Sequence, residues 1–160
     1  MNCIIDVNVL AAANLRATHL SPLDALKCID FLESVKKEEG CVSMDEGGLI
    51  FQEYANYASH KGQPGVGDVF FKWLFDNQGY DAVCEKGAIV EHPDRGFEEY
   101  PDAHSVSNFD WNDRKYVAVA VASEKAPAIY NATDSDWWDF QEAFFELGII
   151  VEQLCSPPAT

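Results

Sequence analysis

The sequence predicts an α/β protein in which a mostly parallel sheet lies between two layers of helices. Short apolar runs that fit strands alternate along the chain with longer segments of helical spacing, and this alternation is typical of a parallel sheet with crossover helices. Consecutive positions in these runs are apolar, so we expect strands that are buried on both faces. Several runs end close to an acidic residue, at the edge where ligands bind in open α/β sheets.

The first half of the chain begins with a strand and a helix, and Ser21 and Pro22 then supply an N-cap and a first-turn proline for a second helix. Gly40 marks the end of that second helix. The expected elements, in order, are strand 2–6, helix 7–16, helix 22–40, strand 41–45, helix 48–58 and, after a glycine-rich loop, helix 69–75.

The second half contains one long segment without a clear pattern. Residues 92–112 read as a polar loop, and a loop of this length inside a compact domain is more often functional than neutral. The other expected elements are one or two short strands within 80–90, an alanine-rich helix 113–122, strand 128–130, helix 134–147 and strand 149–151.

Length and composition fit one domain, which we place at residues 1–155, followed by a short tail at 156–160. No apolar run approaches the roughly 18 residues of a membrane span. No basic segment followed by a long apolar stretch marks a signal peptide, so we expect a cytoplasmic protein that has no membrane contact. The five cysteines are scattered without a CxxC pair, which supports neither a zinc site nor a disulfide framework.

The net charge of −16 argues against a protein that grips nucleic acid over a broad surface, because such proteins carry a basic patch. Residues 126–160 contain neither Lys nor Arg. Metal ions offset negative charge inside a site, but not across a whole surface. The acidity therefore keeps open a second class of function, a module that binds a basic partner.

Three aspartates stand at expected strand ends or helix starts, namely Asp6, Asp113 and Asp134, and Glu53 lies one turn into the third helix. A parallel sheet brings such positions together at one edge. Carboxylates are the ligands that Mg²⁺ and Mn²⁺ prefer, and a pair of these ions activates water for phosphodiester hydrolysis. Each aspartate alone also fits a simple N-cap, and with 27 acids in the chain no single position is informative. The prediction of a metal site therefore depends on the positions taken together.

Three segments resemble the PIN domain, a family of metal-dependent ribonucleases. Residues 4–10 (IIDVNVL) resemble its opening strand and acid. Residues 109–120 (FDWNDRKYVAVA) are similar to its third acidic segment, in which an Asp heads an alanine-rich helix. Residues 131–137 (NATDSDW) are similar to its last motif, although Ala132 stands where a hydroxyl residue is common and Trp137 where Phe is usual.

The resemblance implies a five-stranded parallel sheet between helices and an active site that binds Mg²⁺ or Mn²⁺. By position, the catalytic and metal-binding residues are Asp6, Glu53, Asp113 and Asp134. Asp45, directly at a strand end, competes with Glu53 for the second acidic position, and Asp136 is a further metal-site residue that assists through a bound water.

The implied activity is an endoribonuclease that hydrolyses RNA with a metal-activated water. The family often supplies the toxin of a toxin–antitoxin pair, which implies a small antitoxin protein as a partner and commonly a homodimer. The alternative is a weakly active or inactive PIN-like module whose acidic surface binds a protein. A phosphotransferase that uses Asp6 is disfavoured, because no second acid follows two residues later.

Two further sets of residues leave alternatives open. Trp111, Trp137 and Trp138 fit either stacking against the bases of a single strand or packing in the core. Arg114 and Lys115 fit either a contact with substrate phosphate or a surface ion pair.

Overall fold

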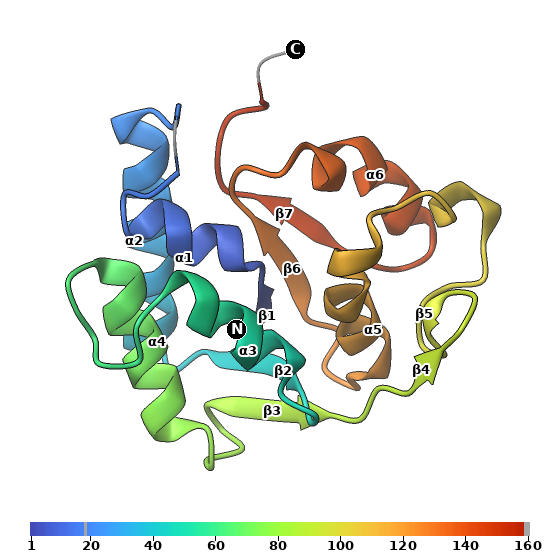
Figure 1. The fold of residues 1–160 in the computed structure, drawn as a ribbon, viewed down its shortest axis with the longest axis horizontal. Helices are drawn as coiled ribbons and strands as arrows, with labels where there is room; N and C mark the ends of the chain where they lie inside the picture. Colours follow the sequence, from blue (N-terminus) through green and yellow to red (C-terminus); the bar gives the residue numbers. More distant parts are fainter. Residues whose placement is uncertain (18, 159–160) are drawn as a thin grey trace.

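A five-stranded sheet forms the centre of the molecule in the computed structural model, which describes residues 1–17 and 19–158 (Figure 1). Its strands are β1 (Asn2–Ile5), β2 (Cys41–Asp45), β3 (Cys84–Gly87), β6 (Ala128–Asn131) and β7 (Val151–Gln153). They lie in the order β3-β2-β1-β6-β7, and every neighbouring pair is parallel. The expected mostly parallel, five-stranded sheet is confirmed.

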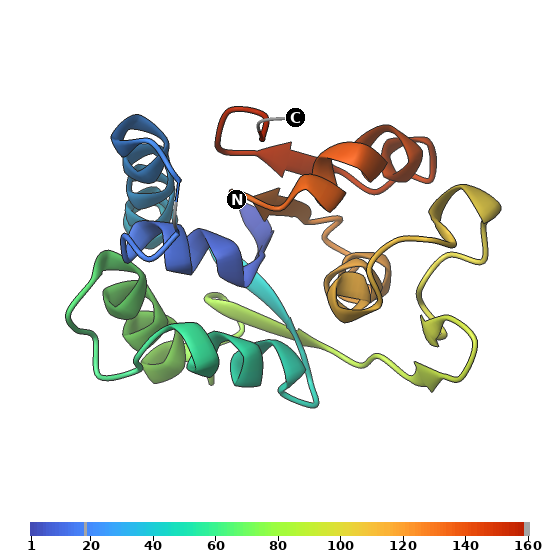
Figure 2. The ribbon, with the colours of Figure 1, turned by 45° about the horizontal axis from the view of Figure 1, so that its top comes forward.

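Helices cover both faces of this sheet. They are α1 (Val7–Ala13), α2 (Pro22–Lys37), α3 (Leu49–Tyr57), α4 (Val66–Asn77), α5 (Arg114–Ala122) and α6 (Ser135–Glu146). The strand order runs outward from β1 in both directions, so right-handed crossovers place α1, α2 and α4 on one face and α5 and α6 on the other (Figure 2). The three-layer α/β/α architecture is thus as expected.

The core is one continuous apolar cluster that extends from Cys3 to Cys155. The two-sided burial of β1 explains its apolar run, because every residue from Cys3 to Ile5 is fully enclosed. The expected tail begins with a tether to α2, since the Ser156 amide donates to Asp24 Oδ1 at 3.2 Å; its residues 159 and 160 lie outside the described part. Among the described residues, no helix combines the length and apolar character of a membrane span.

The segment 92–112 is more structured than the expected polar loop. It contributes to a small antiparallel hairpin of β4 (Glu91–His92) and β5 (Gly96–Phe97), which stands beside α5 in Figure 1. Two 3₁₀ turns follow, η1 (His104–Val106) and η2 (Trp111–Asp113). These elements are only two or three residues long, too short to give a periodic signal in the sequence.

The last strand lies two residues later than expected, at Val151–Gln153. Gly148, at φ 81°, ends α6 in the left-handed conformation. The Ile149 amide then donates to the Phe144 carbonyl at 2.9 Å, which closes the helix. Ile149 therefore belongs to the helix end, and pairing with β6 begins at Val151.

Candidate metal centre

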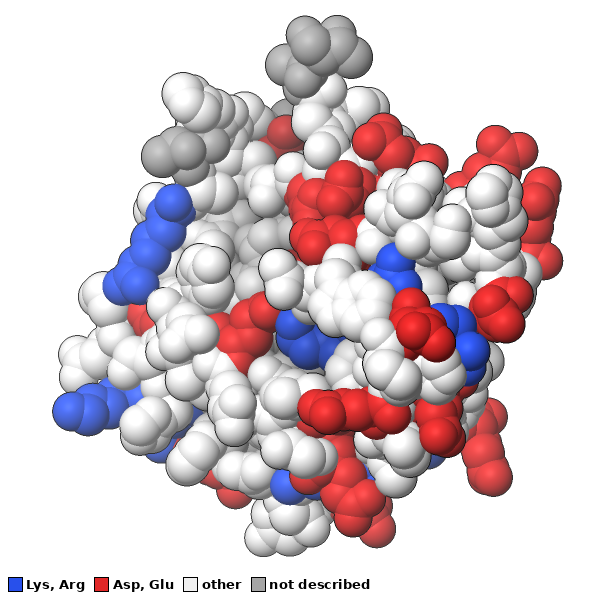
Figure 3. Space-filling model, turned by 45° about the vertical axis from the view of Figure 1, so that its right-hand side comes forward, with Lys and Arg blue, Asp and Glu red and all other residues white. Residues whose placement is uncertain are grey.

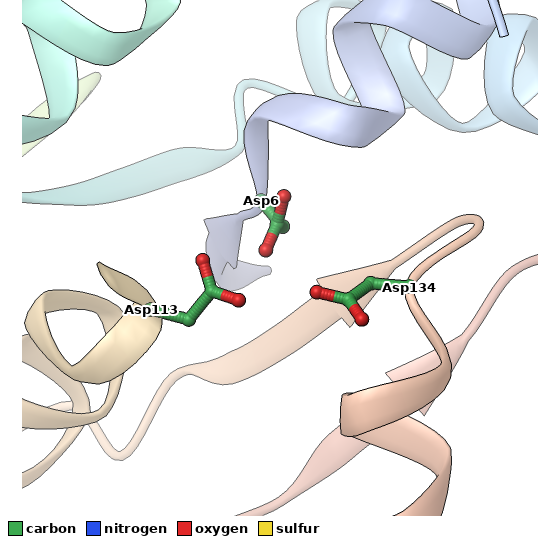
Figure 4. Close-up of side chains that lie close together, drawn as sticks. All are labelled: Asp6, Asp113 and Asp134. Atoms are coloured by element: carbon green, nitrogen blue, oxygen red, sulfur yellow. The ribbon is translucent and has the colours of Figure 1, made fainter. Parts of the chain in front are cut away.

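Three aspartates from distant parts of the chain meet at the carboxyl edge of the sheet (Figure 4). Asp6 follows the central strand β1, Asp134 follows its neighbour β6, and Asp113 precedes α5. One carboxylate oxygen from each lies within 4.8 Å of those of the other two. The strand order reverses direction at β1, and such a switch point is where open α/β sheets form their binding crevices.

Asp6 is held rigidly from two sides. Its Oδ1 accepts a hydrogen bond from the Asn8 amide at 2.9 Å, which caps α1, and its Oδ2 accepts one from the Trp137 indole at 2.8 Å. The side chain is 3% exposed. Burial raises the pKa of Asp6 to about 7, and the negative charges of Glu53 and Asp134 add to this effect although both hydrogen bonds oppose it.

Asp113 is the most strongly perturbed of the three. Its pKa is raised to about 9, and burial is the largest cause. Repulsion from Asp6 and the contact with Asp134 raise this pKa further. Asp134 is fixed by its role as N-cap of α6, where Oδ1 accepts from the Asp136 amide at 2.9 Å. A cluster of carboxylates that resists ionisation gains a large stabilisation from a cation, because the cation relieves the repulsion that raises these pKa values.

Glu53 reaches the same place from α3. Its Oε2 accepts from Lys115 Nζ at 2.7 Å, and its Oε1 accepts from the Tyr116 hydroxyl. That hydroxyl oxygen also accepts from the Val7 amide at 3.2 Å, so α1, α3 and α5 are linked beneath the site. The four acids of the implied set, from Asp6 to Asp134, line one cleft of about 410 Å³.

Asp45 occupies a different environment. Its two oxygens accept hydrogen bonds from the backbone amides of Leu49, at 2.7 Å, and Ile50, at 2.9 Å, in the first turn of α3. It is not among the residues that line the acidic cleft, whereas Glu53 is. Asp136 is also outside the lining of the cleft; burial and repulsion from Asp134 raise its pKa.

Two asparagines that the sequence reasoning missed align the loops of the site. Asn8 Nδ2 donates to Asn131 Oδ1 at 2.9 Å, and the Ala132 amide donates to Asn8 Oδ1 at 2.8 Å. Asn131 in turn donates to the Asp134 carbonyl at 2.9 Å. This network joins the first turn of α1 to the loop after β6. Polar residues close to the ends of two strands were the available signal, but the pairing of Asn8 with Asn131 is not visible in the sequence.

The two basic residues of α5 are buried. The surface ion pair that was one interpretation of the sequence is therefore wrong for them. Arg114 and Lys115 are 5% and 9% exposed. The Arg114 guanidinium donates to the carbonyls of Ser107 and Phe109, both at 2.9 Å, and so anchors the preceding loop. Lys115 forms a largely buried ion pair with Glu53 and lines the acidic cleft.

The three tryptophans differ in exposure. Trp137 is fully buried and packs against Phe109 with ring centroids 4.8 Å apart, so it belongs to the core. Trp138 is partly buried on α6. Trp111, in η2, is 50% exposed. Of these rings, Trp111 is therefore the most exposed to a ligand.

Comparisons of the chain with models of known protein families, with curated proteins and with solved structures find no significant match.

Proposed function

We propose that this protein is a Mg²⁺- or Mn²⁺-dependent endoribonuclease. The observation that carries the proposal is the convergence of Asp6, Asp113 and Asp134 at the switch point of the sheet, with an oxygen of each within 4.8 Å of the others. Carboxylates without sulfur or imidazole neighbours are a donor set for a hard divalent cation. The three segments that resemble the PIN domain support RNA as the substrate.

The residues present fit such an ion. Asp6, Asp113 and Asp134 would hold it. Asp6 is buried, and burial raises its pKa to about 7, as expected for a carboxylate that lacks a countercharge. When bound, a divalent cation supplies Lewis acidity toward a phosphate oxygen and toward a water molecule.

The surrounding residues of the chain orient the acids. The Trp137 indole and the Asn8 amide fix Asp6, so its carboxylate cannot rotate away from the cleft. Tyr116 and Lys115 hold Glu53 at the cleft wall. Lys115 also places a positive charge in a cleft that would receive a phosphodiester, which offsets part of the local negative charge.

The test is RNA cleavage with a matched pair of variants. Labelled single-stranded and structured RNAs are incubated with the protein in Mn²⁺, in Mg²⁺ and in EDTA. We expect cleavage by the wild type in either metal and none in EDTA. Asp113→Asn should slow cleavage by about 100-fold or more, because metal chemistry contributes several kcal/mol to such reactions.

Asp30→Asn is the control, since Asp30 is exposed on α2 and the same charge is removed there. Its cleavage rate should equal that of the wild type. The proposal fails if the wild type cleaves none of the RNAs, or if Asp113→Asn cleaves them as fast as Asp30→Asn does.

The charge of the molecule favours a second candidate, an acidic module that binds a basic protein. The net charge is −16, and acidic side chains cover more of the face shown in Figure 3 than basic side chains do. Like charge repels RNA over such a surface and attracts a basic partner. This function predicts no stabilisation by Mn²⁺ and a salt-sensitive complex with a basic polypeptide such as polylysine.

A further inference from the structure

A second cleft adjoins the acidic one. It has a volume of about 620 Å³ and lies between the β4–β5 hairpin and η2. Its walls include His92 and Phe97 from the hairpin and Trp111 from η2. None of the acids assigned to the metal centre lines it, so it is a separate hollow with an aromatic lining.

Trp111 is presented in this cleft by a rigid support. The Arg114 guanidinium packs over the indole at 4.7 Å from the ring centroid, and over the buried Tyr100 ring at 4.4 Å. Arg114 is itself fixed by hydrogen bonds to the Ser107 and Phe109 carbonyls. A half-exposed tryptophan held in this way loses little conformational entropy when it binds a flat ring.

The two clefts share part of their walls. Asn112 and Lys115 line both of them. Trp111, Asn112 and Asp113 are consecutive residues of the single turn η2, so the chain passes from the aromatic cleft to the metal centre within this turn. Two residues of a 3₁₀ turn advance about 4 Å. A ligand held on Trp111 would therefore occupy a cleft that shares Asn112 and Lys115 with the acidic cleft.

The lining favours a neutral aromatic ligand over a phosphate. Glu91 lines the cleft, and its carboxylate repels an anion but accepts hydrogen bonds from the amino groups of a base. Lys115 also lines the cleft, but its charge is paired with that of Glu53. Phe97 and the half-exposed Trp111 supply aromatic lining, and stacking on aromatic rings is the general means by which proteins hold single-stranded bases.

We propose that this hairpin cleft binds a nucleobase of the RNA strand, from a nucleotide adjacent to the phosphate at the metal centre, by stacking on Trp111. The inference rests on the proposed function for its substrate, and it adds that the substrate is read as an unpaired strand. A base inside a duplex presents no free face to Trp111.

The test measures binding, not cleavage. A fluorescein-labelled hexauridylate is titrated with the full chain in Ca²⁺, anisotropy is recorded, and the intact length of the probe is checked on a gel. Trp111→Ala should raise Kd at least about fivefold, because loss of stacking on one base costs about 1–3 kcal/mol. Trp111→Phe, which keeps a ring, should recover most of the affinity.

Tyr80→Ala is the matched control, since Tyr80 is a 65% exposed aromatic residue near the amino end of β3 and lines neither cleft. Its Kd should equal that of the wild type. Thermal melts of every variant confirm that the proteins compared are folded.

The outcomes separate this inference from the proposed function. If Trp111→Ala binds the probe as tightly as Tyr80→Ala, or if the wild type does not bind it, the base-binding cleft is ruled out, whether or not RNA is cleaved. If binding depends on Trp111 but no RNA is cleaved in any metal, the cleft stands and the nuclease does not.

Discussion

Asp6 and Asp45 occupy matching places and have different surroundings. Each follows a central parallel strand, Asp6 after β1 and Asp45 at the end of β2, and they are 3% and 1% exposed. Both oxygens of Asp45 accept backbone amides of α3. Asp6 accepts one amide and one indole, and its carboxylate also faces Asp113 and Asp134.

A buried acid at a strand end is therefore not by itself evidence of a metal ligand. The amides around Asp45 compensate its charge locally, as an N-cap does. Asp6 has neighbours of its own charge, and burial with this repulsion raises its pKa to about 7. Its two hydrogen bonds do not offset the burial and the repulsion, so ionised Asp6 is costly unless a cation lies beside it.

The largest effect that separates the two environments is stabilisation by metal. Mn²⁺ at a hundredfold excess over its Kd should raise the free energy of unfolding by about 2.7 kcal/mol, or the Tm by about 5–10 °C. Asp113→Asn should abolish this rise. We choose Asp113 for the variant because Asp6 also caps α1 and holds Trp137, so its replacement would disturb the fold.

Asp45→Asn is the informative control for this measurement. It should start from a lower Tm, because an amide cannot accept both α3 hydrogen bonds, yet keep the full rise in Mn²⁺. Equal metal responses of Asp113→Asn and Asp45→Asn in differential scanning fluorimetry would show that the comparison between the two environments is wrong.

The next effect concerns stability without metal. Asp45→Ala leaves the Leu49 and Ile50 amides of α3 without their acceptors, which should lower the free energy of unfolding by about 2 kcal/mol. Urea denaturation in EDTA measures it, with Asp30→Ala on the exposed face of α2 as the control. A loss below about 0.5 kcal/mol would mean that Asp45 does not act as the cap of α3.

The sequence was sufficient to predict the sheet and its layers because the signals are local. Two-sided apolar runs mark β1 and β2, and Ser21 caps α2 through the Asp24 amide at 3.1 Å, as its position before Pro22 indicates. The β4–β5 hairpin has no such signal. Its position beside α5 depends on Arg114, whose guanidinium bonds the Arg95 carbonyl, and that contact is specified only by the folded chain.

The site was predictable to a similar extent. The positions of Asp6, Asp113 and Asp134 follow from strand ends and helix starts, and the structure brings them together. The sequence could not decide whether Glu53 or Asp45 is the second acid of the site. Both lie close to the carboxyl end of β2, and what distinguishes them is the groups that their oxygens contact in the folded chain. That choice depends on Lys115 and Tyr116, which arrive from α5, more than sixty positions later in the chain.

The effect most specific to the acidic cluster is the pH dependence of the metal-free protein. The pKa values of Asp6 and Asp113 are raised to about 7 and about 9, whereas an unfolded Asp titrates near pH ~4. Between these limits the folded state binds more protons than the unfolded state, so the free energy of unfolding falls as pH rises. The slope is at most about 1.4 kcal/mol per pH unit for each group.

Urea denaturation in EDTA between pH 5 and pH 9 should therefore show stability that decreases toward alkaline pH. Asp113→Asn should flatten the part of the slope above neutrality, because its amide carries no proton to lose. Saturating Mn²⁺ should also remove the slope, since a bound cation takes over the role of the protons. A metal-free stability that rises with pH would mean that the carboxylates of Asp6 and Asp113 are already compensated in the folded protein.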